Sequence, residues 1–180
     1  MDTTSAILLR RTKLSDTSLI VTWFTEEHGR VKTVAKGARR PRSAFAGKLD
    51  LFYDAEIQFI RSRKSSLHIL KEVAVRDSRE GLSRDYARVR LASYFVELVE
   101  LVTEPEHALP GLYDLLQRAF TYLQTQAASR RALLHFESEL VRLLGIHGQA
   151  KVTPAVAIGR AYGRLPATRP DLVRSLDVTD

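Results

Sequence analysis

Basic side chains gather in one stretch of this chain, residues 30–48, which reads RVKTVAKGARRPRSAFAGK and contains no acidic residue. Arginine presents a planar fork and lysine a compact charge, and both suit the oxygens of a phosphate backbone. The stretch also carries one aromatic ring, which can stack on an unpaired base. We therefore expect a nucleic-acid-binding site made of Arg30, Lys32, Lys36, Arg39, Arg40, Arg42, Phe45 and Lys48. A charged loop that contacts only solvent is the alternative.

The distribution of charge along the chain also favours a polyanionic partner. The formal net charge is +7. Residues 1–80 hold 16 Lys and Arg against 10 Asp and Glu, a net of +6, whereas residues 81–180 hold 12 against 11, a net of +1. A positive field concentrated in one half attracts an anionic polymer to that half. We expect affinity for nucleic acid mainly in residues 1–80.

No residue pattern in the chain indicates catalysis. The absence of cysteine excludes disulfides, thiol chemistry and cysteine zinc sites. The Gly47-Lys48 pair lacks both the upstream glycine and the following Ser or Thr of a phosphate-binding loop. Acidic residues at expected turns, such as Glu104 and Glu106, are expected to face solvent. The sequence predicts a protein that is not an enzyme and needs no cofactor, metal or small-molecule substrate.

The basic stretch lies within a part of the chain that has the alternation of β-strands. Short strands are expected at residues 6–12, 19–24, 29–36, 51–60 and 67–75. In the third of these, Arg30, Lys32 and Lys36 share one face, and Gly37 and Pro41 then lead the chain into a loop. Five short strands in so short a span predict a small closed barrel of the OB type, formed by residues 1–80.

Residues 81–180 change to the spacing of amphipathic helices. Apolar side chains recur at three and four positions in residues 86–102, in a second helix from near Pro110 to 126, and in a third that Ser129 caps and Gly145 ends. Beyond Gly148, only residues 172–176 suggest a helical turn or two. The expected fold class is α+β, with an OB-like barrel followed by a small helical domain.

Neither a membrane span nor a signal peptide is expected. The chain has no run of about 18 apolar residues, which a membrane helix requires. At the N-terminus, MDTTSAILLRRTK, the charges follow the apolar stretch, which is the reverse of the order in a signal peptide. These features predict a cytoplasmic protein.

Several segments resemble the RecO family of recombination and repair mediators. The most distinctive is the run from Val34 to Ser43, VAKGARRPRS, with Lys-Gly-Ala-Arg-Arg directly after a strand. The other similar segments are AILLR at residues 6–10, LSDTSLIVT at 14–22, HGR at 28–30, ASYFVEL at 92–98 and FESEL at 136–140. The likeness covers about residues 5–145.

The resemblance implies an N-terminal OB fold, a C-terminal helical domain and a location at the bacterial nucleoid. It implies binding of single- and double-stranded DNA, annealing of complementary strands, and help in loading the recombinase RecA on covered single strands. Single-strand-binding protein and RecR are the implied partners. Several family members carry a four-cysteine zinc site after the position of Gly145, but this chain has no cysteine. We expect a shortened helical domain without zinc.

The helical half has more apolar positions than one narrow seam requires, since Leu98, Val99, Leu101 and Val102 nearly encircle its first helix. Ordinary packing explains this excess. The functional alternative is an apolar groove that accepts the short acidic, apolar tail of single-strand-binding protein, with a basic rim of Arg130, Arg131 and Arg142.

Two other functions compete with the DNA mediator. An RNA-binding OB module would use the same basic surface, because RNA and DNA share the phosphate backbone. A pure protein adaptor would bind no nucleic acid at all. The response of binding to salt, and its need for a ribose hydroxyl, distinguish the three.

Overall fold

A computed structural model describes residues 1–147 and 151–177 of the chain. The chain divides into two compact units. The first holds Met1–Arg79 together with Thr103–Leu109, and the second holds Glu80–Val102 and the chain from Pro110 onward. Among the described residues, no helix combines the length and the apolar character that crossing a membrane requires.

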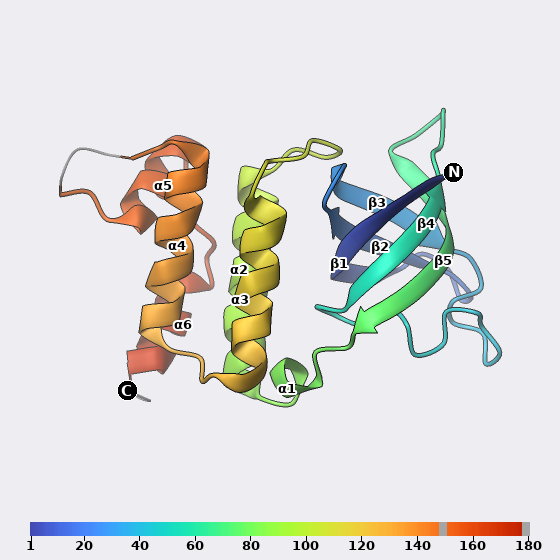
Figure 1. Ribbon diagram of the computed structural model, residues 1–180, viewed down its shortest axis with the longest axis horizontal. Helices are drawn as coiled ribbons and strands as arrows, with labels where there is room; N and C mark the ends of the chain where they lie inside the picture. Colours follow the sequence, from blue (N-terminus) through green and yellow to red (C-terminus); the bar gives the residue numbers. More distant parts are fainter. Residues whose placement is uncertain (148–150, 178–180) are drawn as a thin grey trace. The chain divides into compact units, whose positions relative to one another are not determined.

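The first unit is a closed barrel of five strands (Figure 1). The strands are β1 (Asp2–Lys13), β2 (Leu19–Thr25), β3 (Gly29–Ala35), β4 (Asp54–Ile60) and β5 (Leu67–Asp77). They follow the order β1-β2-β3-β5-β4, and β4 closes on β1. All pairs are antiparallel except β3 with β5. The predicted OB-like barrel is confirmed.

The long strand β1 allows the barrel to close. Its N-terminal half pairs with β4 and its C-terminal half with β2, and the register shifts between Leu8 and Arg10. Such a shift marks a β-bulge, which bends a strand and increases its twist. The bend lets one strand serve both neighbours, so the sheet has no free edge at this side.

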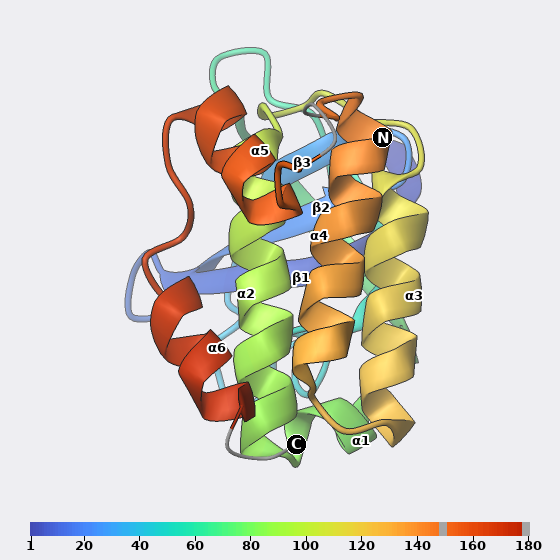
Figure 2. The ribbon, with the colours of Figure 1, turned by 90° about the vertical axis from the view of Figure 1, so that its left-hand side faces the viewer.

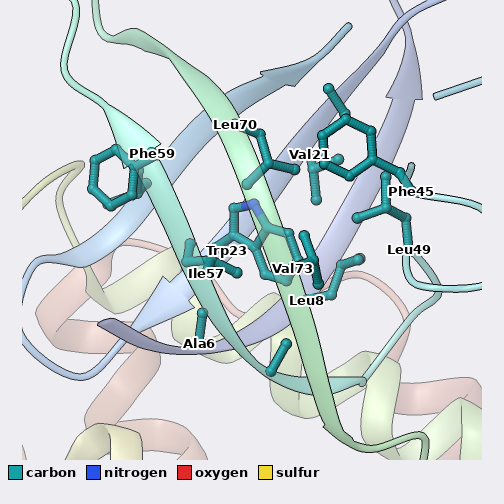
Figure 3. Packing of buried hydrophobic residues seen from close by; sticks show 13 residues of the cluster. Ala6, Leu8, Val21, Trp23, Phe45, Leu49, Ile57, Phe59, Leu70 and Val73 are labelled. Carbon is teal, nitrogen blue, oxygen red and sulfur yellow. The ribbon is translucent and has the colours of Figure 1, made fainter. Parts of the chain in front are cut away.

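Alternating side chains fill the barrel. On β3, Val31, Thr33 and Ala35 point inward, while Arg30 and Lys32 point outward, as the sequence predicted. The central side chain is Trp23, whose indole Nε1 donates a hydrogen bond to Thr33 Oγ1 at 3.0 Å and so satisfies its one polar atom. Figure 3 shows Phe45 and Leu49 at one end of this cluster and Phe59 at the other.

The second unit consists of helices. They are α1 (Glu80–Ser83), α2 (Tyr86–Val102), α3 (Leu112–Thr125), α4 (Arg130–Leu144), α5 (Pro154–Tyr162) and α6 (Arg169–Asp177). Helices α2, α3 and α4 run side by side, with α5 packed on α4, and α6 packed on α2 and α4 (Figure 2). The predicted caps of α4 are present: Ser129 Oγ accepts from Ala132 N, and Gly145 ends the helix with φ 64°. The helical part is confirmed.

Helix α5 was not expected, because two prolines and two glycines interrupt this part of the chain. Two of these residues stand at the ends of the helix, and Gly159 lies within it. Thr153 is the N-cap, Pro154 begins the helix, and Gly163 ends it in the left-handed conformation.

The connection between α2 and α3 forms part of the barrel unit. The Glu106 N–H donates to the Arg30 carbonyl at 2.8 Å, and Arg30 Nη2 donates to the Thr103 carbonyl at 2.8 Å. Gly29 has φ +65°, and a Cβ there would lie 2.2 Å from the His107 carbonyl oxygen. Residues 103–109 therefore lie tightly against the start of β3, where only glycine fits.

Candidate nucleic-acid interface

The segment that follows β3 forms an ordered loop, which we call the basic loop (residues 36–48). Gly37 and Gly47 both have φ 71°, and consecutive turns occupy the residues between them. The Arg39 N–H donates to the Thr17 carbonyl at 3.0 Å, and the Gly37 N–H donates to Ser18 Oγ at 3.3 Å. The basic loop is thus joined by hydrogen bonds to the β1–β2 turn.

Four cations of the basic loop are exposed and carry no ion pair within the described part of the chain: Lys36, Arg40, Arg42 and Lys48. Arg39 is also exposed, but its Nη1 donates to the Ser15 and Asp16 carbonyls at 3.1 and 3.2 Å. These acceptors are backbone carbonyls, so they hold the loop in place without a carboxylate that would offset the charge of Arg39. The structure brings five of the predicted cations together at one end of the barrel.

The two cations predicted on β3 differ in their availability. Lys32 is exposed on the outer face of the strand. Arg30 lies on the same face but is half-buried, because its guanidinium binds the Thr103 carbonyl. Arg30 is therefore an anchor of the connection 103–109 rather than a free phosphate ligand.

Phe45 was expected to stack on an unpaired base, but its ring does not project from the loop as an open platform. Its side chain is only 8% exposed and packs in the barrel core with Leu49 (Figure 3). The prediction assumed that a loop tip has no core to fill. The basic loop instead returns over the open end of the barrel, where burial of an aromatic ring is favourable.

The turn between β4 and β5 adds two cations that were not among the predicted site residues. Arg63 and Lys64 are exposed and form no ion pair among the described residues. Because Leu67, the first residue of β5, pairs with Lys32, this turn ends beside β3. OB folds bind oligonucleotides on the β2–β3 face and on the β1–β2 and β4–β5 loops. In the sequence, the signal for this part of the site is a pair of adjacent basic residues, Arg63 and Lys64, at the tip of a turn.

Glu106 was expected to face solvent, and it is exposed, but its carboxylate also binds two side chains of the barrel. Its Oε2 lies 2.9 Å from Arg61 Nη1, and its Oε1 lies 3.0 Å from His68 Nε2. The Ser62 N–H donates to His68 Nδ1, so His68 carries its proton on Nε2 and donates it to Glu106. The other side of Arg61 binds Asp2, and this hydrogen bond lowers the pKa of the Asp2 carboxyl. The sequence does not indicate these two contacts, because they depend on the docking of residues 103–109 against the barrel.

The helical unit contains a cavity of about 500 Å³ between α2, α3 and α4. Phe95 and Phe136 stack in its apolar floor, with ring centroids 4.0 Å apart. Its polar lining is provided by Arg118, Tyr122, Arg131 and His135. The cavity combines an apolar floor with a basic rim.

Of the three arginines predicted for such a rim, only Arg131 lines this cavity. Arg130 binds Asp177, with Nη1–Oδ1 at 2.9 Å, and Arg142 binds Glu139, with Nη2–Oε2 at 2.8 Å. The rim is completed instead by Arg118 and His135. The spacing of four between Arg131 and His135, which places both on one helix face, was the signal that the sequence offered.

The described residues hold no group of three or more His, Asp or Glu side chains that could bind a metal ion. The chain also contains no cysteine, so its residues do not fit the zinc site that the resemblance implies for several relatives.

The strand order, the unopposed cations of the basic loop and the helical second unit define an OB-fold protein with a basic face. The family model "Recombination protein O N terminal" matches residues 1–79, and "Recombination protein O C terminal" matches residues 83–148. The chain belongs to the RecO family.

Curated relatives agree with this assignment. The chain is 34% identical over 140 residues to the DNA repair protein RecO of Rhodopirellula baltica, a match that covers 78% of this chain and 52% of that protein. It is 30% identical over 158 residues to the DNA repair protein RecO of Bifidobacterium longum, covering 86% of this chain and 64% of that protein. The chain thus matches about half to two thirds of the length of these relatives.

Proposed function

We propose that this chain binds single- and double-stranded DNA through its barrel and acts as a mediator of DNA repair and homologous recombination in the bacterial cytoplasm, at the nucleoid. In this role it anneals complementary strands and helps to load a recombinase on single strands covered by single-strand-binding protein, with RecR as a further partner. The observation that carries the proposal is the set of four exposed cations on the basic loop of an OB barrel from the RecO family, none of which forms an ion pair with residues 1–147 or 151–177.

The arrangement suits contacts with the backbone of the strand. Arg40 and Arg42 extend from a loop that Arg39 holds in place, so their charges are partly pre-positioned for phosphates. Phosphate contacts fix where a strand lies but carry no sequence information. A protein that binds in this way holds strands of any sequence and leaves their bases free to pair.

Annealing is the activity that tests the proposal. The protein is expected to accelerate the pairing of two complementary oligonucleotides without ATP and in the presence of EDTA, because neither a nucleotide-binding loop nor a group of metal ligands is involved. The readout is fluorescence transfer between dyes on the two strands. Loss of the acceleration in EDTA would reveal a metal requirement, and no acceleration in any buffer would refute the annealing role.

The cavity of the helical unit supports a second part of the proposal, the capture of the tail of single-strand-binding protein. Phe95 and Phe136 offer an apolar floor for the apolar end of this tail, and Arg131 offers a charge for its acidic part. Arg118 lines the cavity too, and its Nε lies 2.9 Å from Asp114 Oδ2, so the tail would share this guanidinium with Asp114. Apolar anchors supply affinity, and rim charges steer the approach. The helical unit would hold the covering protein while the barrel takes the exposed strand.

Replacing Arg118 and Arg131 with alanine is expected to weaken binding of a synthetic tail peptide about tenfold, since each exposed charge contributes roughly 0.5–1 kcal/mol. The matched control is the double alanine variant of Arg130 and Arg142, which bind Asp177 and Glu139 instead of lining the cavity. Isothermal titration calorimetry at low salt measures the affinity of each double variant for the peptide. Absence of peptide binding by the unmodified protein, or equal losses in the two variants, would refute the assignment of the cavity.

A further inference from the structure

A small cavity of about 180 Å³ lies beneath the basic loop. It is lined by the ends of β1 and β2, by the basic loop and by the segment between this loop and β4, through Arg11, Leu19, Phe45, Gly47, Asp50 and Tyr53. The part of the Phe45 ring that the barrel core leaves uncovered therefore meets this cavity. A ring that is too buried to project into solvent still forms a wall of the cavity.

The size and lining of the cavity suit one flat heterocycle. Pockets for drug-sized ligands measure roughly 300–1,000 Å³, so this cavity is too small for a ligand of that size. Phe45, Tyr53 and Leu19 provide aromatic and apolar surface, on which a base stacks whatever its sequence.

Polar groups of both kinds lie at the edge of the cavity. Arg11 Nη2 lies 3.2 Å from Asp50 Oδ1, and Arg11 Nη1 donates to the Leu49 carbonyl at 2.9 Å. These contacts place one guanidinium donor and one carboxylate acceptor beside the cavity. Both side chains are about half exposed and can also bind a ligand. The edge of a nucleobase carries donors and acceptors that fit such groups, whereas an aliphatic ligand carries neither.

The entrance to the cavity is lined by small residues and lies within a loop rich in cations. Ala46 is exposed, and Gly47 has no side chain and nothing within 4 Å of where a Cβ would stand. Lys48 follows directly, and Arg40 and Arg42 precede on the same loop, all without an ion pair among the described residues. A phosphate backbone held by these charges would pass the entrance with its bases within reach.

We infer that this cavity accepts one unpaired base of the strand that the basic loop holds. The inference rests on the proposed function, because it takes DNA as the ligand. The phosphates on either side bind the loop cations, while the base turns inward against Phe45 and Tyr53. A paired base cannot enter without leaving its partner, so the cavity gives the barrel a preference for single strands.

The test compares an ordinary single-stranded oligonucleotide with one of equal length whose central positions are abasic. A stacked base contributes roughly 1–3 kcal/mol, so the unmodified protein is expected to bind the ordinary strand about five- to a hundredfold more tightly. Ala46→Leu fills the cavity and is expected to remove this difference. Ala44→Leu is the matched control, because Ala44 is exposed on the same loop but does not line the cavity.

The abasic strand also reports on folding, since an unfolded variant would lose affinity for both oligonucleotides. Equal binding of the two strands by the unmodified protein would overturn the inference and leave the proposed DNA binding intact. A difference that persists in Ala46→Leu would place the base elsewhere and would also overturn it. Binding of neither strand by the unmodified protein would refute the proposed function itself.

Discussion

Alanine at Arg39, Arg40 and Arg42 is expected to weaken the binding of single-stranded DNA about a hundredfold at 0.1 M salt and to flatten its salt dependence by roughly two units of log K per unit of log salt. Each neutralised phosphate of a single strand contributes about 0.7 to this slope, because binding releases condensed counterions. If each of the three arginines contacts one phosphate, their removal lowers the slope by about 2.1, which is the expected flattening. Fluorescence anisotropy of a labelled strand at several salt concentrations measures both quantities.

Two further variants separate charge from structure. Arg39 also holds the basic loop to the carbonyls of Ser15 and Asp16, so its loss changes more than charge. The double alanine variant of Arg40 and Arg42 leaves these hydrogen bonds intact and is expected to flatten the slope by about 1.4. The matched control removes three cations that already bind carboxylates: Arg76, Arg84 and Arg174. A triple loop variant that behaves like this control would contradict the assignment of the basic loop.

The second large effect is expected from a buried ion pair in the helical unit. Glu137 on α4 has no exposed surface, and its two carboxylate oxygens lie 2.6 and 3.0 Å from Arg169 Nε and Nη2. The Tyr94 hydroxyl donates to the same carboxylate at 2.6 Å. Burial and the neighbouring Glu137 charge raise the pKa of Tyr94, and the hydrogen bond with Glu137 raises the pKa of Arg169. One carboxylate thus joins α2, α4 and the start of α6.

Glu137→Ala is expected to lower the free energy of unfolding by about 3–5 kcal/mol, because it leaves a guanidinium and a buried hydroxyl without their acceptor. Glu139→Ala, two residues further along the same helix, is the matched control. Glu139 binds Arg142 at the surface, and such pairs contribute only about 0–1 kcal/mol. Urea denaturation measures both variants. Equal losses would show that the buried carboxylate does not hold these helices together.

The parts of the fold that depend on local patterns could be predicted from the sequence. The alternation of Val31, Thr33 and Ala35 with Arg30 and Lys32 fixes which face of β3 enters the barrel, because side chains of a strand alternate between its faces. The cap residues of α4 likewise act on their own helix. The exposed cations of the basic loop were predictable for the same reason, since a run without acidic residues has no local partner.

The parts that were missed depend on contacts between distant residues. Phe45 is buried because the loop returns over the barrel end, and no spacing within the loop indicates that return. Glu106 lies 38 residues from His68, and Glu137 lies 32 residues from Arg169. Each pair forms only after separate elements dock, so an acidic residue read in its own segment looks like solvated surface. The same limit explains why Arg118, on a different helix from Arg131, was not predicted for the rim.

The most direct test of the central claim is a salt titration of the unmodified chain with three ligands: single-stranded DNA, duplex DNA and RNA of the same sequence as the single strand. Binding through about five phosphates predicts that log K for single-stranded DNA falls linearly with log salt at a slope near −3.5. Binding of both DNA forms, with no requirement for a ribose hydroxyl, is the result expected of a DNA mediator. Binding that requires the ribose hydroxyl would identify an RNA-binding module instead. Binding that does not respond to salt, or no binding at all, would leave a protein adaptor and contradict the claim.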